Sequence, residues 1–91
     1  MNLAKKILEI CQDKKITLAA AESESGGYLS YLLTKTPGSS KVFKGSFVVY
    51  SLASKNKLFK LPKKLLKKTQ GVSQEIAAYL AEKIRKKLKS N

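Results

Sequence analysis

Histidine is absent from this sequence, and cysteine and arginine occur once each, at Cys11 and Arg85. Without histidine the usual metal-ligand sets are missing, and so is the commonest general base near neutral pH. A single cysteine also excludes an internal disulfide. Any acid–base chemistry must therefore use lysine, tyrosine, glutamate or aspartate, and we expect neither a metal nor another cofactor.

Long apolar runs are also missing, since none approaches the ~18 residues that would indicate a membrane span. The first residues, Met1 to Lys6, continue directly into an amphipathic pattern and lack the apolar core and cleavage site of a signal peptide. We therefore expect a cytoplasmic protein with no membrane partner. With 91 residues, 43% of them hydrophobic, the chain has room for one globular domain.

Positive charge, by contrast, is abundant. The chain has 19 basic and 6 acidic residues, a formal net charge of +13, and all basic residues except Arg85 are lysines. Such a field can attract nucleic acid or an acidic protein partner. Arginine is better suited than lysine to bidentate recognition of phosphates and bases, so its scarcity weakens a dedicated nucleic-acid role. A solvated lysine-rich surface is the simpler interpretation, and a noncatalytic basic binding module is the alternative.

Hydrophobic periodicity predicts an α/β domain. The expected elements are helix 2–14, strand 16–21, helix 28–33, strand 43–50, helices 51–59 and 62–68, and a last helix after the N-cap Ser73 with its apolar stripe over 76–88. Cys11 continues the apolar stripe of the first helix, so we expect it to pack in the core. The order implies a parallel βαβ unit. Because two strands make a very small sheet, we expect a second copy or a companion chain to complete it.

The turn after the first predicted strand is Ala21-Glu22-Ser23-Glu24-Ser25-Gly26-Gly27. The start of the following helix offers free backbone N–H groups that suit phosphates and oxyanions, and the glycines let a ligand approach the backbone. Taken alone, however, serine before glycine at a helix start more often marks ordinary capping.

A serine nucleophile in this turn would need a base to take its proton. Lysine serves when burial or neighbouring positive charge lowers its pKa. Lys55 is the best candidate, because it follows the strand end at Tyr50 and Ser51 by one helical turn, whereas most other lysines lie in charged runs. Ligands collect at the carboxyl ends of parallel strands, so we expect Ser23, Tyr50 and Lys55 at one edge of the sheet.

Four short motifs occur in order at suitable spacing. They are the turn 21–27, Pro37-Gly38-Ser39-Ser40 with Phe43, Tyr50-Ser51 with Lys55, and Gly71-Val72-Ser73-Gln74-Glu75. Together they resemble the C-terminal domain of CinA-type competence/damage-inducible proteins, the nicotinamide-nucleotide amidohydrolases, from about Ile16 to Leu88. The resemblance implies a three-layer α/β/α fold. The family's domain continues with further strands beyond the matched part, so we expect residues 1–91 to form a single, incomplete domain of this type.

The resemblance also implies an activity, the hydrolysis of nicotinamide mononucleotide to ammonia and nicotinate mononucleotide. Ser23 would then attack the carboxamide carbon, with Lys55 as base and Tyr50 assisting proton transfer; Ser25 and Ser39 are alternative nucleophiles. The residues implied in substrate or oxyanion binding are Ser25, Gly26, Gly27, Gly38 and Ser39. The family carries Cys-Thr where this chain has Glu24-Ser25, which introduces a carboxylate, and an inactive truncated domain is the other interpretation.

Overall fold

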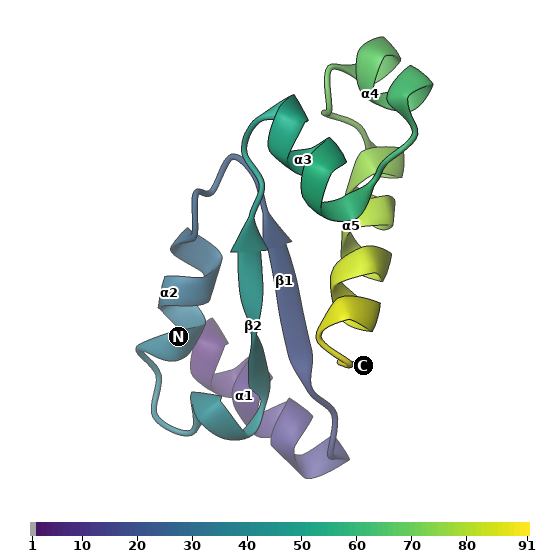
Figure 1. The fold of residues 1–91 in the computed structure, drawn as a ribbon. Coiled ribbons are helices and arrows are strands. Elements are labelled where there is room, and N and C mark those ends of the chain that lie inside the picture. The colour runs from purple at the N-terminus through teal and green to yellow at the C-terminus, as the bar shows by residue number, and fades with distance from the viewer. Residues whose placement is uncertain (1) are drawn as a thin grey trace.

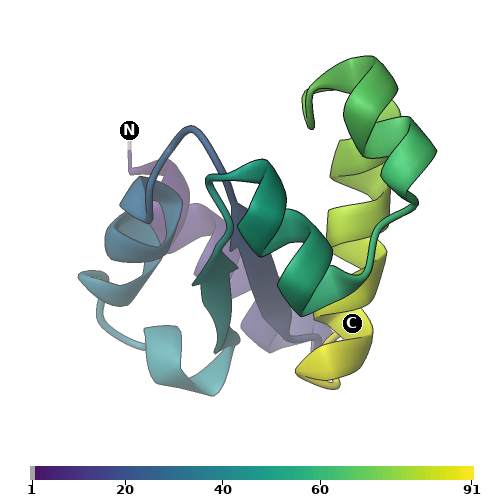
Figure 2. The same cartoon turned by 45° about the horizontal axis from the view of Figure 1, so that its top comes forward.

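The computed structural model describes residues 2–91, which form three layers with a parallel sheet between two layers of helices (Figure 1). The elements are α1 (Leu3–Lys14), β1 (Leu18–Glu22), α2 (Tyr28–Thr34), the 3₁₀ helix η1 (Ser39–Lys41), β2 (Phe43–Val48), α3 (Leu52–Phe59), α4 (Lys63–Thr69) and α5 (Gln74–Lys87). Figure 2 shows α1 and α2 on one face of the sheet and α5 on the other. The predicted α/β class and the parallel βαβ unit are confirmed.

Within residues 2–91 the sheet has two strands, which pair in parallel from Leu18 beside Phe43 to Glu22 beside Val48. β2 carries one extra residue near its start, and Gly45 takes a φ of +145° there, a conformation that favours glycine. The first strand begins two residues later than predicted. The reason is that the Ile16 N–H donates to the Cys11 carbonyl and closes α1.

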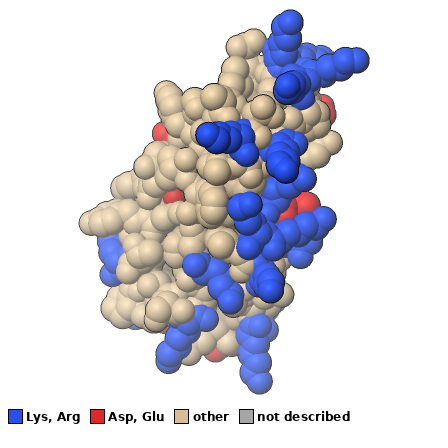
Figure 3. Space-filling model, viewed as in Figure 1, with Lys and Arg blue, Asp and Glu red and all other residues tan. Residues whose placement is uncertain are grey.

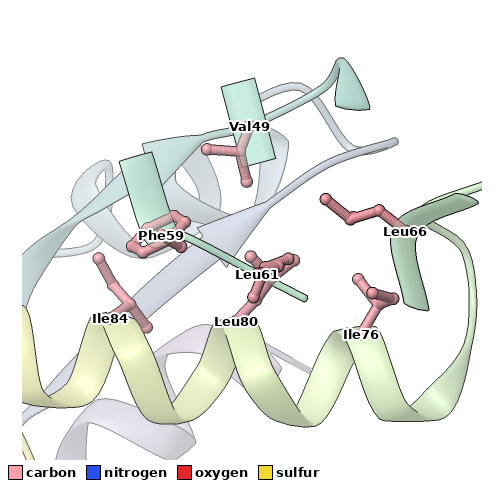
Figure 4. Close-up of a cluster of buried hydrophobic side chains, with 7 residues drawn as sticks. All are labelled: Val49, Phe59, Leu61, Leu66, Ile76, Leu80 and Ile84. Atoms are coloured by element: carbon pink, nitrogen blue, oxygen red, sulfur yellow. The ribbon is translucent and has the colours of Figure 1, made fainter. Parts of the chain in front are cut away.

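Two apolar clusters lie on the two faces of the sheet. The larger one joins α5 to the end of β2, α3 and α4 (Figure 4), and its buried members are Val49, Phe59, Leu61, Leu66, Ile76, Leu80 and Ile84. The smaller one consists of Leu8, Cys11, Leu33 and Val42. Cys11 is buried, as predicted. Side chains alternate between the clusters along β1, since Leu18 packs against the smaller and Ala19 and Ala21 against the larger.

Serine side chains cap two helices beside the carboxyl end of the sheet, and the cap at Ser73 was predicted. Ser51 Oγ accepts a hydrogen bond from the Ser54 N–H at 3.0 Å, and Ser73 Oγ accepts one from the Ile76 N–H at 3.1 Å. With Ser51 as its cap, α3 starts at Leu52, shortly after β2 ends at Val48, and Lys55 lies in its first turn. Over the part of the chain that the structure describes, no helix combines the length and apolar character needed to cross a membrane.

Candidate active site

Ser23 and Lys55 are in contact, although they lie 32 positions apart in the sequence. Lys55 Nζ donates hydrogen bonds to Ser23 Oγ and to the backbone carbonyl of Tyr50, each at 2.9 Å. Ser23 follows β1 directly, and Lys55 lies just beyond β2, so the parallel arrangement brings both residues to the same edge. A nucleophile and a base within hydrogen-bonding distance is the basic geometry of covalent catalysis.

The Lys55 side chain is buried, with 3% of its surface exposed. Burial disfavours the charged ammonium and lowers the pKa of Lys55 from its ordinary value of 10.5, whereas the nearby Glu24 carboxylate opposes this shift. Since the lowering dominates, a larger fraction of Lys55 is neutral at a given pH than for an exposed lysine. A neutral amine is the form that can accept a proton from serine.

Gly71 helps to bury the Lys55 stem, a role that the sequence did not reveal. A Cβ added to Gly71 would lie 2.6 Å from Leu52 Cδ2 and 3.4 Å from Lys55 Cδ. The side chains of α3 therefore approach the Gly71 backbone more closely than any side chain at position 71 would allow. Gly71 also has a φ of +76°, which disfavours other residues. The only signal in the sequence is a glycine two residues before the N-cap Ser73.

Glu22 is the second buried charged residue at this edge, with 3% of its surface exposed. One oxygen, Oε1, accepts hydrogen bonds from Ser25 Oγ at 2.8 Å and from the Leu29 N–H at 2.9 Å. Oε2 accepts from the Ser30 N–H at 3.1 Å and from Ser30 Oγ. Burial raises the pKa of Glu22, but the hydrogen bonds from Ser30, Ser25 and the Leu29 amide outweigh it, so the pKa lies below its usual value.

These contacts distinguish the two serines of the turn. Ser25 Oγ donates to Glu22, whereas Ser23 Oγ accepts from Lys55. The Leu29 and Ser30 amides at the start of α2 also donate to Glu22, so the protein's own carboxylate occupies the helix start that was expected to hold an anion. The turn itself is made by Gly26 and Gly27, whose φ angles are +60° and +105°.

Three other predicted site residues, Gly38, Ser39 and Tyr50, do not place a side chain against the Ser23–Lys55 pair in the part of the chain that the structure describes. Gly38 and Ser39 precede β2, whose first residue pairs with Leu18 at the start of β1, so both lie at the opposite edge from Ser23. Within this chain they are not brought to Ser23. Tyr50 contacts Lys55 through its backbone carbonyl, and the Tyr50 residue is 69% exposed.

A cavity of about 490 Å³ lies beside Ser23 and Lys55, between β1 and α5. Ser23, Glu24, Lys55 and Gly71 line it near the carboxyl end of β1. Apolar side chains of α5, including Ile76, Leu80 and Ile84, line the rest. The volume falls within the range of about 300–1,000 Å³ that is typical of small-molecule sites. Such sites are usually lined by apolar side chains with a few polar groups, as this cavity is.

The model of the CinA C-terminal domain matches residues 1–91 of this sequence. The chain belongs to the CinA C-terminal domain family. A CinA-like protein of Prochlorococcus marinus subsp. pastoris is 41% identical over 90 residues, which cover 99% of this chain and 21% of that protein. A CinA-like protein of Pseudothermotoga lettingae is 36% identical over 91 residues, which cover 100% of this chain and 22% of that protein.

Solved CinA structures share the fold of this chain. The competence/damage-inducible protein CihA of Agrobacterium tumefaciens superposes with a TM-score of 0.92 at 27% identity, over 98% of this chain and 54% of that one. A CinA superfamily protein of Escherichia coli gives a TM-score of 0.94 at 23% identity, over 99% of this chain and 52% of that one. This CinA domain thus spans about a fifth of those curated relatives and about half of those solved chains.

Proposed function

We propose that this CinA domain carries the serine–lysine site of an amidohydrolase that cleaves the carboxamide of nicotinamide mononucleotide. The observation that supports this most directly is the 2.9 Å hydrogen bond between the buried Lys55 Nζ and Ser23 Oγ, beside a cavity of about 490 Å³. The substrate class follows from the resemblance to nicotinamide-nucleotide amidohydrolases. The apolar wall formed by α5 suits the flat nicotinamide ring.

The proposed reaction begins with neutral Lys55. Its amine has two N–H bonds and one lone pair, so it can donate to the Tyr50 carbonyl while the lone pair accepts the Ser23 hydroxyl proton. Ser23 Oγ then attacks the carboxamide carbon to form a tetrahedral oxyanion. Protonated Lys55 returns the proton to the leaving nitrogen, ammonia departs, and the nicotinate group stays as an ester on Ser23. Water, activated by Lys55, hydrolyses this ester and releases nicotinate mononucleotide.

The backbone amides of Glu24 and Ser25 are the proposed oxyanion donors. They directly follow Ser23, and among residues 2–91 neither amide N–H donates to a protein acceptor. Amides that are fixed in the turn before the reaction starts stabilise a developing charge without reorganisation. The start of α2 does not serve this purpose, because Glu22 already accepts from its Leu29 and Ser30 amides.

The test is ammonia release from nicotinamide mononucleotide by the purified chain. We expect Ser23→Ala and Lys55→Met to reduce the rate by about 10³-fold or more, as removal of a nucleophile or its base does in other hydrolases. Ser40→Ala, at an exposed position of η1, and Lys57→Met, one half-turn further along α3, are the matched controls and should retain the rate. No release by the folded wild type, or equal rates in wild type and Ser23→Ala, would contradict the proposal.

A second candidate function is a basic binding module for nucleic acid or an acidic protein. Basic side chains gather over the α4 and α5 side of the molecule (Figure 3). Within residues 2–91 the ion pairs are confined to Glu82, which contacts Arg85 at 2.8 Å and Lys86 at 3.5 Å, so most of this charge has no carboxylate partner. This function predicts binding to a short DNA duplex whose affinity falls steeply with salt. Equal weak binding to any polyanion would leave only nonspecific charge attraction.

A further inference from the structure

Glu22 is a buried carboxylate to which the proposed reaction gives no role. A charged side chain with 3% exposure is costly unless its oxygens are paired. Here each oxygen accepts two hydrogen bonds, from Ser25 and Leu29 on one side and from Ser30 on the other. Charge-assisted bonds of this kind are shorter and stronger than neutral ones. The side chain therefore holds a particular arrangement of the turn.

The donors come from the turn that follows Ser23 and from the helix that begins after it. Ser25 belongs to the turn itself, and Leu29 and Ser30 belong to the first turn of α2. Because one carboxylate binds all three, residues 22–30 are closed into a compact loop. Helix capping alone would explain the Leu29 and Ser30 bonds, since Gly27 at the N-cap has no side chain to provide them. It does not explain the bond from the Ser25 hydroxyl.

The backbone of Glu22 is fixed by the neighbouring strand. Its carbonyl accepts a hydrogen bond from the Val49 N–H at 2.7 Å, and the next residue after Val49 is Tyr50. The Tyr50 carbonyl in turn accepts from Lys55 Nζ. Glu22 thus connects the segment that carries Ser23 with the segment that orients Lys55.

We propose that Glu22 is a positioning residue that determines which serine of the turn can react. By holding the Ser25 hydroxyl and the start of α2, its carboxylate keeps Ser25 away from Lys55 and presents Ser23 Oγ to the lysine amine. This inference rests on the proposed serine–lysine site. It assigns the choice between Ser23 and Ser25 to a residue that does not touch the reacting atoms. A displacement of about 1 Å in such a site can reduce the rate about 10²-fold.

The experiment uses Glu22→Gln, which keeps the size of the side chain but replaces one acceptor oxygen with a donor group. Glu9→Gln, an exposed change of the same type in α1, is the matched control. Each protein is treated with a fluorophosphonate, and mass spectrometry locates the labelled serine. In parallel, proton NMR measures the nuclear Overhauser effect between the Lys55 Cε protons and the Ser23 Cβ protons. Circular dichroism establishes that each variant is folded.

We expect the wild type and Glu9→Gln to be labelled at Ser23. In folded Glu22→Gln the labelling rate of Ser23 should fall about 10- to 100-fold, label should appear at Ser25, and the nuclear Overhauser effect between Lys55 and Ser23 should disappear. Labelling of Ser23 at the wild-type rate, with the Overhauser effect intact, would overturn the proposal. If the wild type is not labelled, the serine–lysine function fails separately, and the Overhauser effect alone decides the role of Glu22.

If Glu22→Gln does not fold, Ser30→Ala replaces it. This variant keeps the carboxylate and removes one of its donors, Ser30 Oγ. The expected decrease in Ser23 labelling is then a few-fold, in the same direction, with a weaker Overhauser effect between Lys55 and Ser23. Unchanged labelling and an unchanged Overhauser effect in folded Ser30→Ala would overturn the proposal in the same way.

Discussion

Gly71 offers a sharp test of how Lys55 is buried, because an alanine there introduces two separate penalties. The first comes from its φ of +76°, a left-handed conformation that costs an L-residue about 1–2 kcal/mol. The second comes from the new methyl group, which would lie 2.6 Å from Leu52 Cδ2 and 3.4 Å from Lys55 Cδ. Leu52 is 38% exposed and can move aside, so this steric penalty falls near the lower end of the overpacking range, about 1 kcal/mol.

Gly38→Ala is the matched control for the stability measurement. Gly38 has a φ of +89°, but an added Cβ would meet no atom within 4 Å. Both substitutions reduce the entropy of the unfolded chain by the same amount, so that contribution cancels between them. We therefore expect Gly71→Ala to lower the free energy of unfolding by about 1 kcal/mol more than Gly38→Ala, and the extra decrease measures the steric conflict with Leu52 and Lys55.

Urea unfolding followed by circular dichroism measures both decreases. For a domain of this size, 1 kcal/mol corresponds to a shift of about 4–8 °C in Tm, which thermal unfolding resolves. Equal midpoints for the two alanine variants would refute the packing argument, because the strain at positive φ would then explain the whole effect. We also expect Gly71→Ala to slow ammonia release, since the displaced Lys55 stem moves the amine away from Ser23.

The other predictions concern the ionisation of Lys55. Because its folded pKa lies below the ordinary 10.5, the unfolded chain binds more protons between those two values, and the free energy of unfolding rises with pH across that window. Lys55→Met should lack this rise, so urea midpoints of wild type and variant should diverge in favour of the wild type as pH increases; parallel curves would contradict the shift. Glu24→Gln removes the carboxylate that raises the Lys55 pKa, so the pH dependence of ammonia release should move to lower pH, whereas Glu9→Gln should leave it unchanged.

Local patterns in the sequence were sufficient for the fold class and for the expectation that Ser23 and Lys55 lie close together. Alternating and helical periodicity identified the elements, and strand–helix–strand order implied a parallel pair, whose carboxyl ends necessarily share an edge. The meeting of Ser23 and Lys55 follows from that topology. Ser51 and Ser73 were also predictable as caps, because capping depends on a hydroxyl and an amide only three residues apart.

Only the tertiary structure decided which groups face each other within that edge. Ser23 and Ser25 are equivalent in the sequence, and the direction of each hydroxyl depends on Glu22 and Lys55, which approach from different elements. The burial of Lys55 depends on Gly71, 16 positions further along the chain, because the absence of a side chain there lets the segment before α5 pack against α3 and cover the lysine stem. Burial and side-chain direction arise from contacts between distant residues, and a local pattern in the sequence does not encode them.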